Sequence, residues 1–413
     1  MTLNATNYSI SKSLFEKIAN AFKKAVTFIH RRGGYKPEYL ADEEVKPLIE
    51  HTYEAFSEAV DFGVKDNVIP EAMKMYLKNN TFVFSGFKTH QQLDRVSRLL
   101  HDDDGHIKPF NRFLKDVQSI DKKYNRTYLQ AEYNFAVASA QSAGKWHKFS
   151  EYADRYYLQY RTAKDERVRE EHAILDGITL PLDDKFWDEY YVPNGWNCRC
   201  DVVQVSKKRY EPSNPSEALA RGRAATYKPN ADGVNKAAIF RFNPGKEQRI
   251  FPKKHPYIPK SCSNCGLNQY AIGGNNIQCP TLCKTTNIFL KKAQKQLKID
   301  LKGVVINNPI IKTNNTFVFT SDARKNIADH CKNIEEIAAV RHLVSNPNDL
   351  MISSRASEPI DTTNHKPANV AKKSLRKVVC YNYYEIEHNG KRFQFSCENI
   401  DNKYEQLYGI KTL

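Results

Sequence analysis

A histidine and two cysteines in the middle of the chain have the types and spacing of metal ligands. Cys198 and Cys200 are two residues apart in NGWNCRC, so in an extended segment both sulfurs leave the same face of the backbone. The turn Pro193-Asn194-Gly195 precedes them, and tight turns favour these residue types. With His172 about 25 residues upstream, two thiolates and an imidazole make three zinc ligands of the usual kinds.

The spacing alone does not identify a fourth ligand. The nearest carboxylates are Asp176, Asp183 and Asp184. Two alternatives to a metal site stay open. The same stretch carries Trp187 and Trp196, so the thiols could stay reduced and pack beneath two indoles. The other alternative is a disulfide, although a bridge within Cys-X-Cys would close a strained ring.

Three arginines accompany these candidate ligands. The guanidinium groups of Arg167, Arg169 and Arg199 could bind phosphate. They could equally pair with nearby carboxylates, which are those of Asp165, Glu166, Asp183 and Asp184. We favour internal ion pairs here, because the charges of both signs lie so close in the sequence.

Four more cysteines lie in two close pairs further along the chain. Cys262 and Cys265 have CxxC spacing, and Cys279 and Cys283 follow in CxxxC spacing after a Gly-rich loop. Four thiolates satisfy tetrahedral zinc, which could supply the folding energy that a segment with so few apolar residues lacks. We therefore predict a basic zinc knuckle with a structural ion, which could contact DNA or RNA. Disulfides or unligated thiols are the alternative.

Length and composition bound the class of protein. At 413 residues the chain is long enough for two or three domains, each with its own core. The formal net charge of +16 makes a polyanionic partner such as DNA or RNA plausible through counterion release.

No segment approaches the roughly 20 apolar residues of a membrane span, and the N-terminus lacks the apolar core of a signal peptide. We expect synthesis in the cytoplasm, where nine cysteines favour metal binding over disulfides.

The first third of the chain has helical periodicity. Apolar residues at spacings of three and four predict a helix over 41–64, capped by Asp42; they are Val45, Leu48, Ile49, Tyr53, Phe56 and Val60. The run Asp102-Asp103-Asp104-Gly105 favours an acidic loop between helices over a metal site. An Ala-rich helix is predicted over 127–149, whose small residues permit close approach of a neighbour.

The C-terminal stretch has the pattern of an α+β domain. Two short strand-like runs precede a helical run over 322–347, and a hairpin is predicted around Asn389-Gly390, a strong type I′ turn signal. Cys331, Cys380 and Cys397 have no partner at close spacing and are most simply core residues.

The stretch that contains the first candidate ligands resembles a known family. The ordered set RTAKDERVREEHAILDGITLPLDDKFWDEYYVPNGWNCRCDV is similar to the signature of the phage Mu F-like proteins, minor head proteins also called phage head morphogenesis proteins. With the preceding helices, the resemblance covers roughly 88–243. It implies a virion protein of the capsid interior or portal region that is needed for head assembly. Portal or capsid proteins would be its partners, and the core would not be an enzyme.

These observations together predict an α+β multidomain protein. Its expected parts are a helical N-terminal region (1–146), a Mu F-like core (147–250), a basic zinc-knuckle-like segment (251–297) and a C-terminal α+β domain (298–413).

The C-terminal domain also resembles the phage-associated nucleases of the barnase, EndoU and RelE-like group. A metal-independent ribonuclease needs a general base, a general acid and a cation for the phosphorane charge. For these roles we assign His330, Arg341, His365 and Lys372; on one helix the first two would share a face. The alternative is an ordinary basic surface. Two rival functions follow, a virion-delivered nuclease effector and a zinc-dependent nucleic-acid-binding protein.

Overall fold

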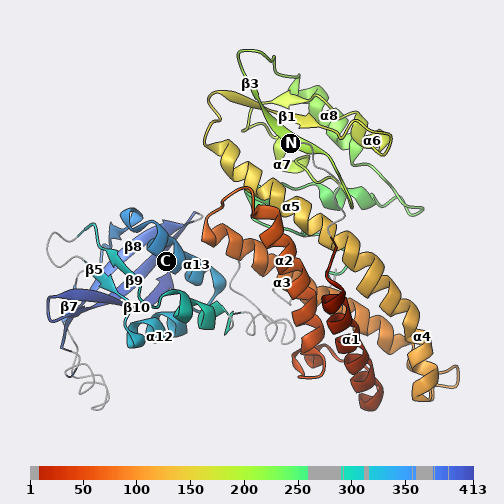
Figure 1. The fold of residues 1–413 in the computed structure, drawn as a ribbon, viewed down its shortest axis with the longest axis horizontal. Coiled ribbons are helices and arrows are strands. Elements are labelled where there is room, and N and C mark those ends of the chain that lie inside the picture. The colour runs from red at the N-terminus through yellow and green to blue at the C-terminus, as the bar shows by residue number, and fades with distance from the viewer. Residues whose placement is uncertain are drawn as a thin grey trace. The chain divides into compact units, whose positions relative to one another are not determined.

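The computed structural model describes residues 9–258, 290–310, 316–359, 375 and 377–413, apart from positions 292, 356 and 389. The chain forms two compact units, one of residues 1–69 and 76–285 and the other of residues 70–75 and 286–413. Both helices and sheets are present (Figure 1), which confirms the α+β multidomain class. The four predicted boundaries stay a prediction, and the four cysteines of the predicted knuckle lie outside the described residues.

Long helices make up most of the first unit. They are α1 (Lys12–Arg32), α2 (Lys46–Val64), α3 (Glu71–Arg98), α4 (Phe110–Lys122) and α5 (Leu129–Ser150). A π-helical turn, Lys123–Tyr128, joins α4 to α5. Helix α5 packs along α2, and α1 packs against α2 and α4. In the part of the chain that the structure describes, none of the helices has the length and apolar character needed to cross a membrane.

Helix α2 confirms the predicted apolar stripe but begins later than predicted. All its members are buried except Tyr53, which is half-buried. The helix starts at Lys46 rather than beside Asp42. Pro47 in the first turn explains this start, because proline has no backbone N–H and suits a position whose N–H has no helical partner. The Asp42 carboxylate accepts instead from the backbone N–H of Glu44, at 3.0 Å, in the preceding turn.

Close packing of α2 on α5 confirms the role of the small residues. A Cβ added to Gly63 would lie 2.5 Å from Cβ of Ala140 and 2.7 Å from the carbonyl oxygen of Val137. We expect Gly63→Ala to lower the free energy of unfolding by about 1–3 kcal/mol through overpacking, despite the better helix propensity of alanine. Urea denaturation measures the change. The control is Glu58→Ala at an exposed position of the same helix, and its free energy of unfolding should lie within about 0.5 kcal/mol of the wild-type value. A Gly63→Ala protein as stable as wild type would contradict this packing.

A small antiparallel sheet follows α5. Its central strand β1 (Tyr156–Arg161) pairs with β2 (Thr179–Leu180) and β3 (Asp201–Ser206). The register places Leu158 opposite Leu180 and Arg161 opposite Asp201. Short helices lie between and after these strands; they are α6 (Glu170–Ala173), α7 (Phe186–Glu189), α8 (Pro215–Ala225) and α9 (Pro244–Glu247). Buried aromatic side chains from β1 and α7 fill the core beneath the sheet.

The second unit is built on one sheet, of strand order β4-β5-β10-β9-β8-β6 with β7 also paired to β8. The strands are β4 (Val305–Asn307), β5 (Thr316–Val318), β6 (Met351–Ile352), β7 (Glu358–Pro359), β8 (Val378–His388), β9 (Lys391–Ile400) and β10 (Tyr404–Thr412). Strands β8 and β9 form the predicted hairpin, with His388 opposite Lys391. Strand β5 runs parallel to β10, and the other pairs are antiparallel.

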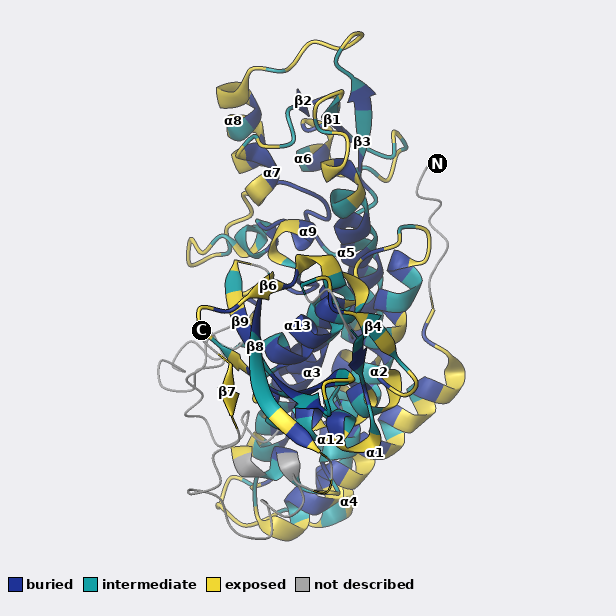
Figure 2. Cartoon of the chain, turned by 90° about the vertical axis from the view of Figure 1, so that its left-hand side faces the viewer, coloured by how far each residue is buried: buried dark blue, intermediate teal, exposed yellow. Residues whose placement is uncertain are grey.

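The helical run predicted over 322–347 is two helices, so that prediction of one helix is wrong. They are α12 (Ser321–His330) and α13 (Ile334–Ser345). Asn333 begins α13, because its side-chain oxygen accepts from the Glu336 N–H at 2.9 Å while the Glu336 carboxylate accepts from the Lys332 N–H at 2.5 Å. This reciprocal arrangement resembles a capping box and favours a new helix start. Helix α13 is dark blue over much of its length in Figure 2, because its apolar side chains are buried.

Candidate metal centre

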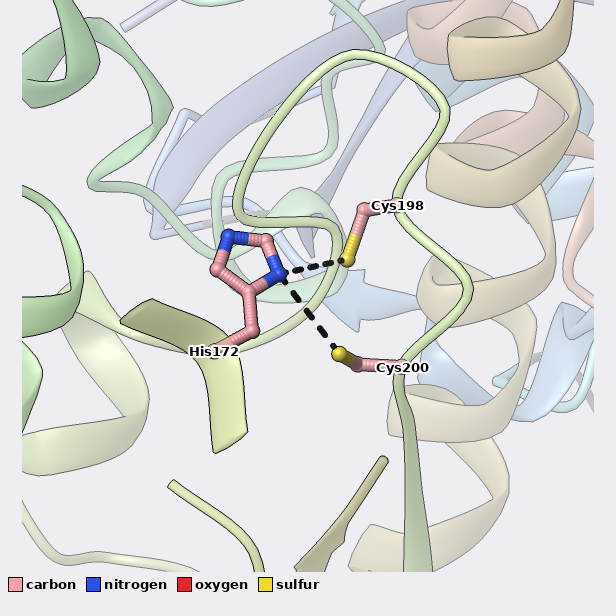
Figure 3. A group of neighbouring side chains, drawn as sticks. All are labelled: His172, Cys198 and Cys200. Atoms are coloured by element: carbon pink, nitrogen blue, oxygen red, sulfur yellow. Dashed lines mark hydrogen bonds between the residues drawn. The ribbon is translucent and has the colours of Figure 1, made fainter. Parts of the chain in front are cut away.

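The structure brings together the histidine and the two cysteines that the sequence singles out. His172 lies on α6, and Cys198 and Cys200 lie on the loop that leads into β3. Figure 3 shows the imidazole facing both thiols. Its Nδ1 lies 3.7 Å from Sγ of Cys198 and 3.7 Å from Sγ of Cys200. All three ligand atoms lie within 4.8 Å of one another.

This geometry fits a tetrahedral zinc ion. With zinc bonds of about 2.3 Å to sulfur and about 2.0 Å to nitrogen, two tetrahedral ligands of these kinds lie about 3.6 Å apart. Both observed N–S distances are close to this value, at 3.7 Å. The donor set of two thiolates and an imidazole is one that zinc prefers. The three residues therefore could hold zinc with little rearrangement.

The loop that carries the thiols is fixed by contacts with β1 and α6. The hydroxyl of Tyr160, on β1, donates to the side-chain oxygen of Asn194 at 2.9 Å. The guanidinium of Arg169, at the start of α6, donates to the carbonyl oxygen of Trp196. Gly195 lies against the same guanidinium, since an added Cβ would be only 2.9 Å from its Nη1. Local turn chemistry and two packing partners thus set the position of the cysteines.

The two thiols lie in different surroundings. Cys200 and His172 are buried, whereas Cys198 is half-buried. A hydrogen bond from Cys200, together with His172, holds the pKa of the Cys198 thiol well below its usual range. The neighbouring Cys198 sulfur and burial raise the pKa of Cys200. Zinc binding requires both sulfurs as thiolates, so the ion would bind with release of a proton from this pair.

Two of the three nearby arginines form internal ion pairs, as favoured from the sequence. Arg199 contacts both carboxylate oxygens of Asp165, each at 2.5 Å. Arg167 lies 3.4 Å from the same carboxylate. The Arg199 guanidinium holds the pKa of Asp165 well below its usual range.

None of the three predicted candidates for a fourth ligand joins the cluster. Asp176 accepts from the backbone N–H of Thr162 at 2.8 Å and from its hydroxyl at 3.0 Å. Asp184 accepts from the backbone N–H of Phe186 at 2.8 Å. Asp183 likewise lies outside the cluster, which has three members within the described part of the chain.

The acidic run after α3 is a loop, as predicted. Asp102, Asp104 and His106 gather near its tip. The Asp102 carboxylate accepts from the backbone N–H groups of Asp104 and His106, at 3.2 and 2.8 Å. Closure of the turn therefore explains this group without a metal ion.

The predicted catalytic residues of the second unit are only partly placed. His330 ends α12, where its Nδ1 lies 2.8 Å from the carbonyl oxygen of Asn326. Arg341 lies on α13 and forms ion pairs with Asp300 and Glu71. Because the two residues are on separate helices, the argument that they share one helix face is wrong. His365 and Lys372 lie outside the described residues, and the catalytic roles stay a prediction.

A buried polar cluster in the first unit was missed from the sequence. Lys88 on α3 is 1% exposed, and its Nζ lies 2.6 Å from Oε2 of Glu132 on α5. The other oxygen of Glu132 accepts from the hydroxyl of Tyr257 at 2.7 Å. Charged side chains on long helices are usually exposed, so helical periodicity gave no sign of this ion pair.

Part of this unit is similar to a known protein family. Residues 105–203 match the family described as Phage Mu protein F like protein. The chain is 44% identical over 82 residues to the putative capsid assembly protein F of Escherichia phage Mu, which is 20% of this chain and 19% of that protein. It is 32% identical over 92 residues to the Mu-like prophage FluMu F protein of Haemophilus influenzae, 22% of each chain.

The matches thus span about a fifth of each relative, 19% and 22%. No solved structure has significant similarity to the chain. The family match begins before α4, ends within β3 and includes His172, Cys198 and Cys200. Residues 105–203 are therefore similar to the Phage Mu F-like family, which confirms the resemblance drawn from the sequence.

Proposed function

We propose that this chain is a phage or prophage minor head protein that acts in capsid assembly, at the portal or in the capsid interior. The observation that carries the proposal is the match of residues 105–203, which includes His172, Cys198, Cys200 and the helices near them. The relative from phage Mu is named a putative capsid assembly protein. Portal or capsid proteins would be the partners, and the virion would be the final location.

A structural zinc site belongs to this proposal. His172, Cys198 and Cys200 would hold the ion, which would crosslink α6 to the loop before β3. The loop has little regular structure of its own, so a crosslink would add to its contacts with β1 and α6 and hold its surface for contacts with other head proteins. Once bound to the ion, both thiolates and the imidazole would serve as its ligands rather than as nucleophile or base, so we assign the centre to structure rather than to catalysis.

Zinc content tests this site directly. The full chain is purified without chelator, and its zinc is compared with that of Cys198→Ser/Cys200→Ser and of Cys262→Ser/Cys265→Ser. We expect each double variant to lose about one equivalent, because two of its ligands are gone. Cys331→Ser is the control, since Cys331 is a buried thiol that donates to the carbonyl oxygen of Ile327. An unchanged zinc content in Cys198→Ser/Cys200→Ser would contradict a site at His172.

Head assembly tests the function itself. The gene is deleted from the phage or prophage that encodes it, and complete heads are counted by electron microscopy after complementation. Wild-type protein and the Cys331→Ser control should restore heads, whereas Cys198→Ser/Cys200→Ser should restore few. Mass spectrometry of purified virions should find the chain. Normal heads in the absence of the gene would overturn the proposal.

A further inference from the structure

A large cavity in the first unit lies beside the cluster of His172, Cys198 and Cys200. Its volume is about 1100 Å³, and His172 forms part of its wall. The other walls come from four places, which are the start of α6, the turn 194–196, the segment 225–240 and the segment 253–258. Of the three proposed zinc ligands, only His172 lines this cavity. This volume is at the upper end of the roughly 300–1,000 Å³ that is usual for ligand pockets.

The lining of the cavity is strongly basic. Five cationic side chains reach it, those of Arg169, Lys228, Lys236, Lys253 and Lys254, against one carboxylate, that of Glu171. All five cationic residues are exposed. Lys253 pairs with Glu247 at 2.9 Å. For Lys228, Lys236 and Lys254, no carboxylate among the described residues lies within ion-pair distance. Clustered cations of this kind attract phosphates.

Aromatic rings share the walls with these cations. Trp196 is half-buried, and the ring centroid of Phe240 lies 5.2 Å from its own, nearly perpendicular at 88°. The ring of His255 lies 5.7 Å away, at 83°. These edge contacts hold the indole in place. Tyr227 is 64% exposed and also lines the cavity. Bases that are not paired stack on such rings.

We propose that this cavity binds single-stranded nucleic acid. Its phosphates would contact Lys228, Lys236 and Lys254, and unpaired bases would stack on Trp196 and Tyr227. A duplex is the poorer fit, because its bases already stack on each other and leave the aromatic walls without a partner. The proposal rests on the charge and rings of the cavity alone, so it stands or falls separately from the capsid role and from zinc.

Binding is measured with the full-length chain and a labelled single strand of about 15 nucleotides, by fluorescence anisotropy at several salt concentrations. In Lys228→Ala/Lys236→Ala/Lys254→Ala we expect the affinity at low salt to fall at least about tenfold. The slope of log affinity against log salt should fall by about 2, since three phosphate contacts are lost. The matched control is Lys12→Ala/Lys23→Ala/Lys24→Ala, three exposed lysines of α1, which should leave both values near wild type.

Tryptophan fluorescence tests the stacking. The chain has 3 tryptophans, and the single strand should quench the emission of Trp196. Trp196→Phe should abolish the quenching, whereas Trp146→Phe should retain it. A duplex of the same sequence should compete at least about tenfold less well. The proposal is overturned if the strand does not bind at low salt, if both lysine variants lose affinity equally, or if duplex binds as well as the single strand without quenching.

Discussion

Replacement of Glu132 by leucine is expected to lower the free energy of unfolding of the first unit by about 3–5 kcal/mol. The carboxylate lies 2.6 Å from Nζ of Lys88, and both side chains are almost fully buried. Burial lowers the pKa of Lys88, and Glu132 opposes that shift. Without Glu132 the ammonium would be buried without its counter-ion, and the hydroxyl of Tyr257 would lose its acceptor.

Tryptophan fluorescence in urea measures this change, because all 3 tryptophans lie in the first unit. Lys88→Met/Glu132→Leu is the companion variant, and it should recover much of the loss, since removal of both charges leaves none unpaired. Arg221→Met breaks the exposed pair of Arg221 with Glu217 and should change stability by less than about 1 kcal/mol. If the free energy of unfolding of Glu132→Leu lies within about 1 kcal/mol of the wild-type value, the buried ion pair of Lys88 and Glu132 is contradicted.

Structural features that depend on residues near one another in the chain could be predicted from the sequence. The apolar stripe of α2 and the β8–β9 hairpin follow from local periodicity and turn chemistry. The closeness of Cys198 and Cys200 follows from a Cys-X-Cys spacing that delivers both sulfurs to one side. Even the break between α12 and α13 has a local signal, because Asn333 and Glu336 have the spacing of a capping box. Apolar periodicity alone does not show this break.

Features that depend on distant residues could not be predicted in this way. The polar cluster joins Lys88 to Glu132 and Tyr257, which come from α3, α5 and the segment after α9. No local pattern pairs such residues, because their contact depends on how the helices pack. The same holds for the basic cavity, whose walls are up to 89 residues apart in the chain, from Arg169 to Ile258. Net charge predicted a polyanion partner but gave no position for it.

The segment around Tyr257 links the buried cluster to the cavity wall. The ring of Phe251 stacks on that of Phe84, with centroids 3.6 Å apart. His255 packs between Tyr257, at 4.4 Å, and Trp196, at 5.7 Å. Trp196 therefore depends for its position on residues that the Lys88–Glu132 pair helps to anchor. Loss of that pair should loosen the cavity wall as well as lower stability.

Acidification from pH 7.5 to pH 5 is expected to cost the first unit about 2 kcal/mol through His255 alone. His255 is 5% exposed, and burial together with the charge of Lys88 lowers its pKa to about 3. The unfolded chain, with a histidine pKa near 6.5, takes up a proton below that pH while the folded chain does not. Stability is therefore full above about pH 6.5 and falls steadily as the pH drops toward the folded pKa.

His255→Asn isolates this contribution. In the folded protein the Nδ1 of His255 accepts from the backbone N–H of Tyr257 at 3.2 Å, and an asparagine side-chain oxygen can replace that acceptor without titrating. Unfolding in urea is followed by tryptophan fluorescence. Between pH 7.5 and pH 5, the free energy of unfolding of His255→Asn should fall by about 2 kcal/mol less than that of wild type. His106→Asn, on the exposed acidic loop, should leave the wild-type pH dependence in place. Parallel pH profiles for wild type and His255→Asn would mean that folding leaves the pKa of His255 unchanged, which would contradict its burial near the charge of Lys88.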